Sequence, residues 1–227
     1  LDGEAVGKLP NVTLVVGNTR KEELASVIAV EAATLEPPVA PIHPIEPVGD
    51  TSRTRAFIKV QDGCRNRCTF CVVTLARGDE RSRAIVEIVG EINALHADGY
   101  QEAVLTGVHL GGYGSDLGVG LRELVEALLR ETRIPRLRLS SLEPFDLQPG
   151  FFDLWPRSDG RLMPHLHLPA QSGSDAVLKR MARRNRVAEF EALVDAARER
   201  IPGLAVTTDL IVGFPGETEA DFEQTLD

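Results

Sequence analysis

The three cysteines of this sequence stand in one short loop, as Cys64, Cys68 and Cys71 in the spacing C-x3-C-x2-C. An odd number of cysteines in one loop is a poor disulfide framework, whereas this spacing is typical of a metal site. Cubane iron–sulfur clusters prefer thiolate ligands. Three thiolates on four irons leave one iron open, as catalytic metal sites keep a vacant position, and an amino and carboxylate pair can chelate it. We interpret the loop as a [4Fe-4S] site with one open iron.

Two alternatives fit the same cysteines. One is a zinc site completed by a distant histidine, for which His96 and His109 are candidates, and the other is a set of cysteines that merely pack. Zinc sites usually pair their cysteines as C-x2-C and supply their own fourth ligand, so the single loop favours the cluster. His109 otherwise fits a loop residue bonded to backbone, without a catalytic role.

The composition sets the class of protein. Hydrophobic residues make up 43% and charged residues 26% of the 227 residues, which is typical of a soluble globular chain. No apolar run approaches the ~20 residues of a membrane span, and no signal peptide begins the chain, so we expect a cytoplasmic protein without membrane contact. The net charge of -9 argues against a chain that is basic all over, but a local basic patch remains open. Because the chain begins with leucine, we expect a piece of a longer protein.

The elements that must position the loop follow a regular pattern. From residue 53 onward, short β-rich runs alternate with segments of helical periodicity, which predicts parallel strands connected by helices. The expected fold class is α/β, a partial parallel (β/α) barrel truncated before its last strand. We predict strands at 57–61, 103–106, 137–140, 165–168 and 205–212, helices around 85–95, 121–129 and 190–197, a helix from about Asp175, and a last helix capped by Thr218 and Asp221.

The first part of the chain has a different organisation. Residues 1–34 are predicted to contain a strand at 12–16 and a helix at about 21–33, and we interpret them as the tail of a preceding α/β domain. Five prolines between residues 36 and 47 predict an extended linker, which we place at 35–52. Residues 53–227 then form the main domain, which we expect to be incomplete.

The other candidate site residues lie in loops that follow strands, because ligands bind parallel α/β folds at the carboxyl ends of the strands. Gly107 lets the backbone approach a ligand closely, although a plain turn fits it equally. Ser141 and Glu143 follow the third strand, where a carboxylate can pair with an ammonium group or serve as an acid at a helix start. Gln171 and Ser172 can bind a ribose or a carboxylate, or act as turn and N-cap residues.

Two basic clusters stand out in this acidic chain. One surrounds the cysteine loop, and the other is a run of five basic residues with no acid between them. Charge runs are most often solvated faces, but two of them near one rim suggest contact with a phosphate backbone. We therefore predict RNA contacts at Lys179, Arg180, Arg183, Arg184 and Arg186.

Several motifs, in order, resemble the methylthiotransferase branch of the radical S-adenosylmethionine (SAM) superfamily. The loop from Thr106-Gly107-Val108-His109 to Gly112-Tyr113-Gly114 is most similar to the MtaB-type subgroup, whose members methylthiolate threonylcarbamoyladenosine beside the tRNA anticodon. The resemblance covers residues 57–227. The other motifs are the cysteine loop with Ala76-Arg77-Gly78 and Arg81-Ser82-Arg83, then Gln171-Ser172-Gly173-Ser174, Leu178-Lys179-Arg180-Met181 and Gly213-Phe214-Pro215-Gly216-Glu217-Thr218.

The resemblance implies a mechanism with two clusters. The cluster on the three cysteines passes an electron to SAM, which releases methionine and a 5′-deoxyadenosyl radical that abstracts hydrogen from C2 of the adenine. A second [4Fe-4S] cluster, held by three cysteines of an amino-terminal domain that this chain lacks, delivers the methylated sulfur. The family's final strand and its carboxyl-terminal RNA-binding domain are also missing, so we expect the chain alone to lack the full activity.

The implied partners are the anticodon stem-loop of a tRNA and an electron donor such as flavodoxin or ferredoxin. Two alternatives within the family act on isopentenyladenosine in tRNA or on an aspartate of a ribosomal protein. An alternative from another class is a zinc-stabilised RNA-binding module without redox chemistry.

Overall fold

A computed structural model describes residues 3–10, 12, 14–17, 20, 23–32 and 54–227 of the chain. The chain divides into two compact units, of which the first combines Leu1–Ser52 with Leu75–Arg77 and the second combines Arg53–Thr74 with Gly78–Asp227. All the candidate site residues lie in the second unit.

The described residues of the first unit form two helices, α1 (Gly3–Gly7) and α2 (Leu24–Ala32). Helix α2 lies within the helix predicted at about 21–33. The strand predicted at 12–16 is wrong for residues 12 and 14–16, which belong to no strand, because no described strand pairs with them. The proline-rich segment 35–52 lies outside the described residues, and the assignment of residues 1–34 to a preceding domain stays a prediction.

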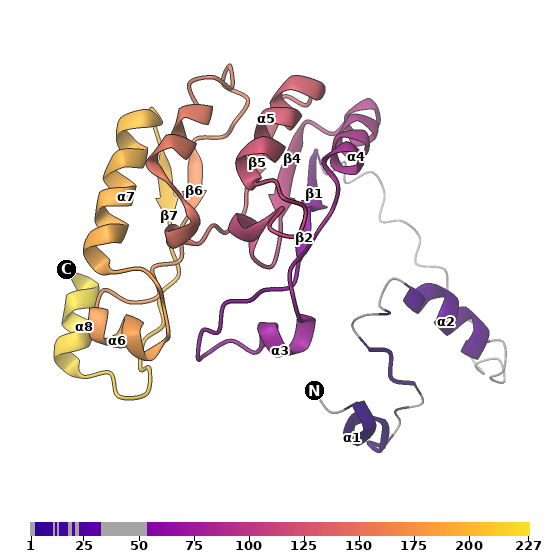
Figure 1. Cartoon of the computed structure of the whole chain (residues 1–227), viewed down its shortest axis with the longest axis horizontal. Helices are drawn as coiled ribbons and strands as arrows, with labels where there is room; N and C mark the ends of the chain where they lie inside the picture. Colours follow the sequence, from indigo (N-terminus) through magenta and orange to yellow (C-terminus); the bar gives the residue numbers. More distant parts are fainter. Residues whose placement is uncertain (1–2, 11, 13, 18–19, 21–22, 33–53) are drawn as a thin grey trace. The chain divides into compact units, whose positions relative to one another are not determined.

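The second unit contains five parallel strands that lie in the order of the chain (Figure 1). The first three form one sheet and the last two form another, and two isolated parallel bridges, Leu137–Leu162 and Ser141–His167, link the segments of the third and fourth strands. The described strands do not close into a barrel, so the predicted α/β class and partial parallel barrel are confirmed. The strands are β1 (Arg55–Lys59), β4 (Glu102–Thr106), β5 (Arg136–Leu139), β6 (His165–His167) and β7 (Ala205–Thr207).

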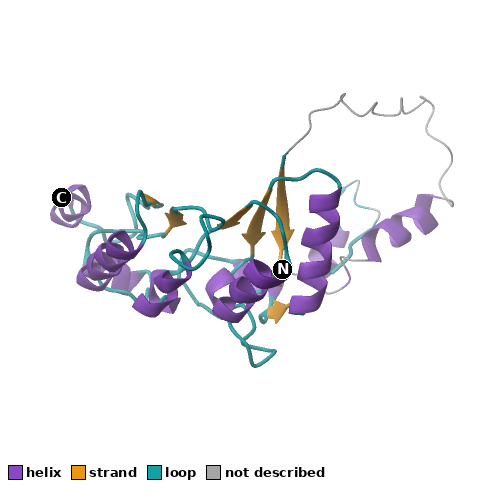
Figure 2. Ribbon diagram, turned by 90° about the horizontal axis from the view of Figure 1, so that it is seen from above, coloured by secondary structure: helices purple, strands orange, loops and turns teal. Residues whose placement is uncertain are grey.

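Helices alternate with these strands along the chain and lie beside them (Figure 2). In α5 the residues Leu121, Leu124, Val125 and Leu128 are buried, which is the spacing of one helix face. Within the described residues, no helix is long and apolar enough to cross a membrane. Helix α3 (Val73–Arg77) is divided between the units, since Leu75–Arg77 belong to the first. The other helices of the second unit are α4 (Ile85–Ala97), α5 (Leu121–Glu131), α6 (Asp175–Arg180), α7 (Val187–Arg200), α8 (Glu219–Leu226) and three 3₁₀ helices, η2 (Leu110–Gly112), η3 (Pro144–Asp146) and η4 (Pro149–Leu154).

The segment predicted as one strand at 57–61 is divided in the structure. Strand β1 ends at Lys59, and β2 (Gln61–Asp62) pairs in antiparallel fashion with β3 (Arg81–Ser82). The cysteine loop therefore leaves and re-enters the domain through a two-stranded ribbon. This arrangement anchors both ends of residues 63–80 beside the carboxyl end of β1.

Candidate active site

The cysteine loop is fixed through its backbone. The Cys64 N–H donates to the Gly78 carbonyl at 3.0 Å, and the Cys71 N–H donates to the Cys68 carbonyl at 3.0 Å. No disulfide joins the three thiols; Cys64 and Cys68 are half-buried and Cys71 is exposed. Burial, above all, raises the pKa of the Cys64 thiol, so a bound metal must supply the stabilisation of its thiolate.

The donor chemistry of the loop fits an iron–sulfur cluster, since three free thiols share one loop. In the part of the chain that the structure describes, no group of three or more cysteine, histidine or acidic side chains has the arrangement of a metal site. Ser140 Oγ, just after β5, and Arg183 Nε, beside the cysteine loop, are buried without a hydrogen-bond partner. A polar ligand would satisfy such atoms.

The histidines considered for a zinc site are engaged elsewhere. Both ring nitrogens of His109 contact carboxylates, at 2.7 Å from Glu80 and 2.5 Å from Asp146. The Nδ1 atom of His96 lies 3.1 Å from the Tyr100 carbonyl oxygen. His96 is in the last turn of α4, which leads to the start of β4 and away from the carboxyl ends of the strands. Neither histidine is placed to complete a zinc site.

Gly63 is the first residue of the cysteine loop and follows β2 directly. Its φ is +79°, and a Cβ atom at this position would lie 1.9 Å from the Asp79 carbonyl oxygen. The backbone of residue 79 passes so close because it belongs to the returning arm of the ribbon. Only glycine satisfies both the left-handed φ and the close approach.

We expect Gly63→Ala to lower the free energy of unfolding by about 1–2 kcal/mol through the positive φ and by about 1–3 kcal/mol more through overpacking. The matched control is Gly203→Ala, because Gly203 has a φ of +71° and no atom within 4 Å of its Cβ position. Urea denaturation of both variants measures the two effects separately. Equal losses in the two variants would show that the approach of Asp79 costs nothing.

Gln61 joins the cysteine loop to the loop after β4. Its side-chain amide donates to the Gly63 carbonyl at 2.8 Å, and its Oε1 accepts from the His109 N–H at 2.8 Å. Gly107 lies against the same side chain, where a Cβ would come within 2.9 Å of Gln61 Oε1. The close approach expected at Gly107 is therefore made to a protein side chain. Gln61 is absent from the predicted site, although a polar residue at the end of an apolar strand is a sequence signal for such a role.

A buried triad of ionisable groups, Glu80–His109–Asp146, lies beside the cysteine loop. The His109 side chain is 7% exposed, that of Glu80 8% and that of Asp146 16%. Burial disfavours the charged imidazole, but the hydrogen bonds and negative charges of Asp146 and Glu80 outweigh it, and the net effect raises the pKa of His109. The Asn66 side-chain amide, from the cysteine loop, lies 3.3 Å from His109 Nε2. The expectation that His109 is a loop residue bonded to backbone is wrong, because its imidazole contacts two carboxylates.

Glu143, which is half-buried, forms an ion pair with the buried Arg183. The Arg183 guanidinium donates to the Glu143 carboxylate, to the Pro169 carbonyl oxygen at 3.1 Å and to Cys68 Sγ at 3.7 Å. The Arg183 side chain is only 1% exposed. The prediction that Arg183 contacts RNA is therefore wrong, because its guanidinium faces the cysteine loop. The expected pairing of Glu143 with the SAM ammonium stays a prediction.

The loop at Gln171 and Ser172 packs against α8. Ser172 Oγ lies 3.3 Å from Thr225 Oγ1 in that helix, and Gln171 has a φ of +70°. Asp221 of α8 accepts from Ser174 Oγ at 2.5 Å and caps its own helix with Thr218, as predicted. These hydrogen bonds, that of Ser174 first, lower the pKa of Asp221 to about 2. Their geometry fits the turn and packing alternative, and SAM contacts at Gln171 and Ser172 stay a prediction.

The other predicted residues lie on the surface or near it. Ser141 is exposed at the end of β5, and Gly107 is half-buried. Of the remaining basic residues, Arg180 pairs with Asp221 at 3.2 Å, and the Arg184 guanidinium lies 4.7 Å from the centroid of the Phe145 ring. The basic residues of the run other than Arg183 are exposed, namely Lys179, Arg180, Arg184 and Arg186.

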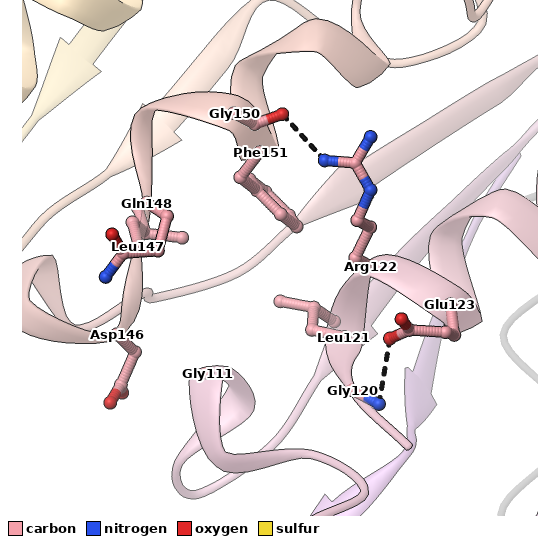
Figure 3. A pocket seen from close by; sticks show the side chains of 10 residues that line it. All are labelled: Gly111, Gly120, Leu121, Arg122, Glu123, Asp146, Leu147, Gln148, Gly150 and Phe151. Carbon is pink, nitrogen blue, oxygen red and sulfur yellow. Dashed lines mark hydrogen bonds between the residues drawn. The ribbon is translucent and has the colours of Figure 1, made fainter.

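A separate cavity of about 310 Å³ lies between the start of α5 and η4 (Figure 3). Its Arg122 donates to the Gly150 carbonyl at 2.7 Å, and Glu123 accepts from the Gly120 N–H at 2.9 Å. Asp146 lines the cavity and also belongs to the Glu80–His109–Asp146 triad. The lining includes none of the cysteines or the predicted SAM contacts.

Comparison with known proteins agrees with this geometry. The family model described as the Radical SAM superfamily matches residues 58–227. A solved structure of the radical SAM methyltransferase TsrM from Kitasatospora setae superposes with a TM-score of 0.63 and 22% identity over 75% of this chain and 33% of that chain. This likeness shows the fold. The chain belongs to the radical SAM superfamily, and membership implies a [4Fe-4S] cluster and SAM as cofactors.

Two curated relatives are similar over much of the chain. The threonylcarbamoyladenosine tRNA methylthiotransferase MtaB of Thermotoga maritima is 40% identical over 95% of this chain and 51% of its own length. A tRNA-2-methylthio-N(6)-dimethylallyladenosine synthase of Halorhodospira halophila is 43% identical over 75% of this chain and 37% of its own length. The chain thus spans about half or less of each of these relatives.

Proposed function

We propose that this chain is the radical SAM portion of a tRNA methylthiotransferase that modifies C2 of N6-threonylcarbamoyladenosine next to the anticodon. The observation that carries the proposal is the loop of three free thiols at the carboxyl end of a parallel strand, in a chain 40% identical to a relative of that name. Other dimethylallyladenosine synthases are 39% identical over 97% of this chain, so identity and coverage do not separate the two substrates. The choice of threonylcarbamoyladenosine is supported by the loop from Thr106 to Gly114, which resembles the MtaB-type subgroup.

In this proposal the residues of the chain hold and orient the cofactors. When bound, the cluster supplies the electron that cleaves SAM and so begins radical chemistry. Cys64, Cys68 and Cys71 are the ligands, and Gln61 and the triad keep the base of their loop against the loop after β4. SAM would contact Gly107, Ser141, Glu143, Gln171 and Ser172.

The proposed partners follow from the same assignment. Lys179, Arg180, Arg184 and Arg186 form an exposed basic surface suited to the phosphates of a tRNA anticodon stem-loop. A second cluster that donates the methylthio sulfur would belong to the part of the protein outside this chain. The reductant would be a low-potential electron carrier such as flavodoxin or ferredoxin, and the reaction would take place in the cytoplasm.

The test is an anaerobic assay with SAM, dithionite and tRNA, followed by nucleoside mass spectrometry. The complete protein should add a methylthio group to threonylcarbamoyladenosine, and it should leave tRNA that carries dimethylallyladenosine unchanged. The chain alone should bind about four irons and release 5′-deoxyadenosine without methylthio product. Product from dimethylallyladenosine tRNA only would replace the proposed substrate, and product from this chain alone would refute the second cluster.

A further inference from the structure

Arg183 is the residue of the basic run that is not part of the exposed surface proposed to bind RNA. Helix α6 ends at Arg180, and Ala182 has a φ of +55° that turns the chain inward. The Arg183 N–H then donates to the Leu178 carbonyl at 2.9 Å, which fixes the residue against the end of the helix. The turn therefore directs one arginine of the run into the protein while its neighbour Arg184 stays exposed.

The cysteine loop docks on this same turn. The Thr69 N–H donates to the Met181 carbonyl at 3.1 Å, and Thr69 Oγ1 donates to the Arg180 carbonyl at 3.0 Å. Next to Thr69, Cys68 Sγ accepts from the Arg183 guanidinium at 3.7 Å. Two hydrogen bonds from Thr69 to backbone carbonyls of the turn thus hold the neighbouring Cys68 close to Arg183.

The charge of Arg183 is held in place from three sides. Glu143 and the Pro169 carbonyl accept its hydrogen bonds, and its guanidinium carbon lies 5.4 Å from the centroid of the Phe145 ring. Burial opposes the cation, but Glu143 and Cys68 outweigh this effect, and the pKa of Arg183 is raised. The Nε atom is buried without a partner in the structure, so the guanidinium has a donor left beside the loop.

We propose that Arg183 is a positioning residue that raises the reduction potential of the cluster by donating a hydrogen bond to the Cys68 thiolate. This inference rests on the proposed function, because it requires a cluster on the three cysteines. Hydrogen bonds to the sulfurs and nearby net charge set the potential of such clusters. A fixed cation beside one sulfur stabilises the form with one more electron, and Glu143 partly neutralises that cation.

The two members of the pair should therefore shift the potential in opposite directions. Arg183→Gln should lower the equilibrium constant for one-electron reduction about tenfold, which corresponds to about 59 mV. Glu143→Gln keeps the guanidinium and removes its counter-charge, so it should raise the potential. Arg184→Gln is the matched control, because Arg184 stacks on the same Phe145 ring without contacting a cysteine, and the potential should not change.

The experiment is a dithionite titration of the reconstituted chain without SAM, followed by electron paramagnetic resonance of the reduced cluster. Iron content is measured on each sample, so that loss of the cluster is distinguished from a change in potential. An unmodified chain that binds no cluster would contradict the proposed function, whereas potentials measured at full iron content test the inference alone. If Arg183→Gln does not retain iron, the inference is tested by Glu143→Gln, whose reduction potential should lie above that of the unmodified chain. Full iron content with unchanged potentials in both variants would overturn the inference.

Discussion

Replacing Cys64, Cys68 or Cys71 by alanine is expected to reduce the iron bound after anaerobic reconstitution from about four per chain to well below one. Two thiolates are too few to hold a cubane cluster, and the candidate replacement ligand His109 is engaged by two carboxylates. Release of 5′-deoxyadenosine from SAM should be lost with the cluster. Iron and sulfide analysis, visible absorption and product chromatography measure the three consequences.

Val72→Ala is a suitable control for the cysteine variants. Val72 follows Cys71 directly and its side chain is exposed, so the variant changes the loop without changing a ligand. It should retain the iron and the SAM cleavage of the unmodified chain. A cysteine variant that keeps four irons would refute the ligand assignment, and a colourless chain with one zinc would establish the zinc alternative.

The variant His109→Gln is expected to lower the free energy of unfolding by about 3 kcal/mol, the cost of leaving buried charges without their partner. Glu80 and Asp146 would then face each other without the intervening cation. The control is His96→Gln, because the His96 ring lies against the Tyr100 backbone carbonyl and not between two carboxylates, and a loss below about 1 kcal/mol is expected for it. Urea denaturation near pH 6 measures both.

The same substitution should change the pH dependence of stability. The folded pKa of His109 is raised, so its contribution is fully present below the unfolded value of about 6.5 and is lost as the pH rises through the folded pKa. The unmodified chain should therefore lose stability over this range relative to His109→Gln. Parallel curves for the two proteins, or equal stability near pH 6, would contradict a charged His109.

The sequence by itself determined the architecture and predicts the cluster ligands. Alternating β-rich runs and helical periods predict the five parallel strands, because local patterns reflect which face of each element is buried. The spacing C-x3-C-x2-C predicts the metal chemistry, because three thiols on one short loop reach the same cluster wherever the loop lies. The cap of α8 was likewise predictable, since Thr218 and Asp221 are three residues apart.

Only the tertiary structure decided what surrounds the cysteine loop. Glu80 and Asp146 stand 29 and 37 residues from His109, and no local pattern relates them. The basic run looked like one surface, but the positive φ at Ala182 separates Arg183 from its neighbours and buries it beside Cys68. A turn of this kind depends on the loop that packs against it. For this reason the spacing of charges in the sequence does not determine which of them is buried.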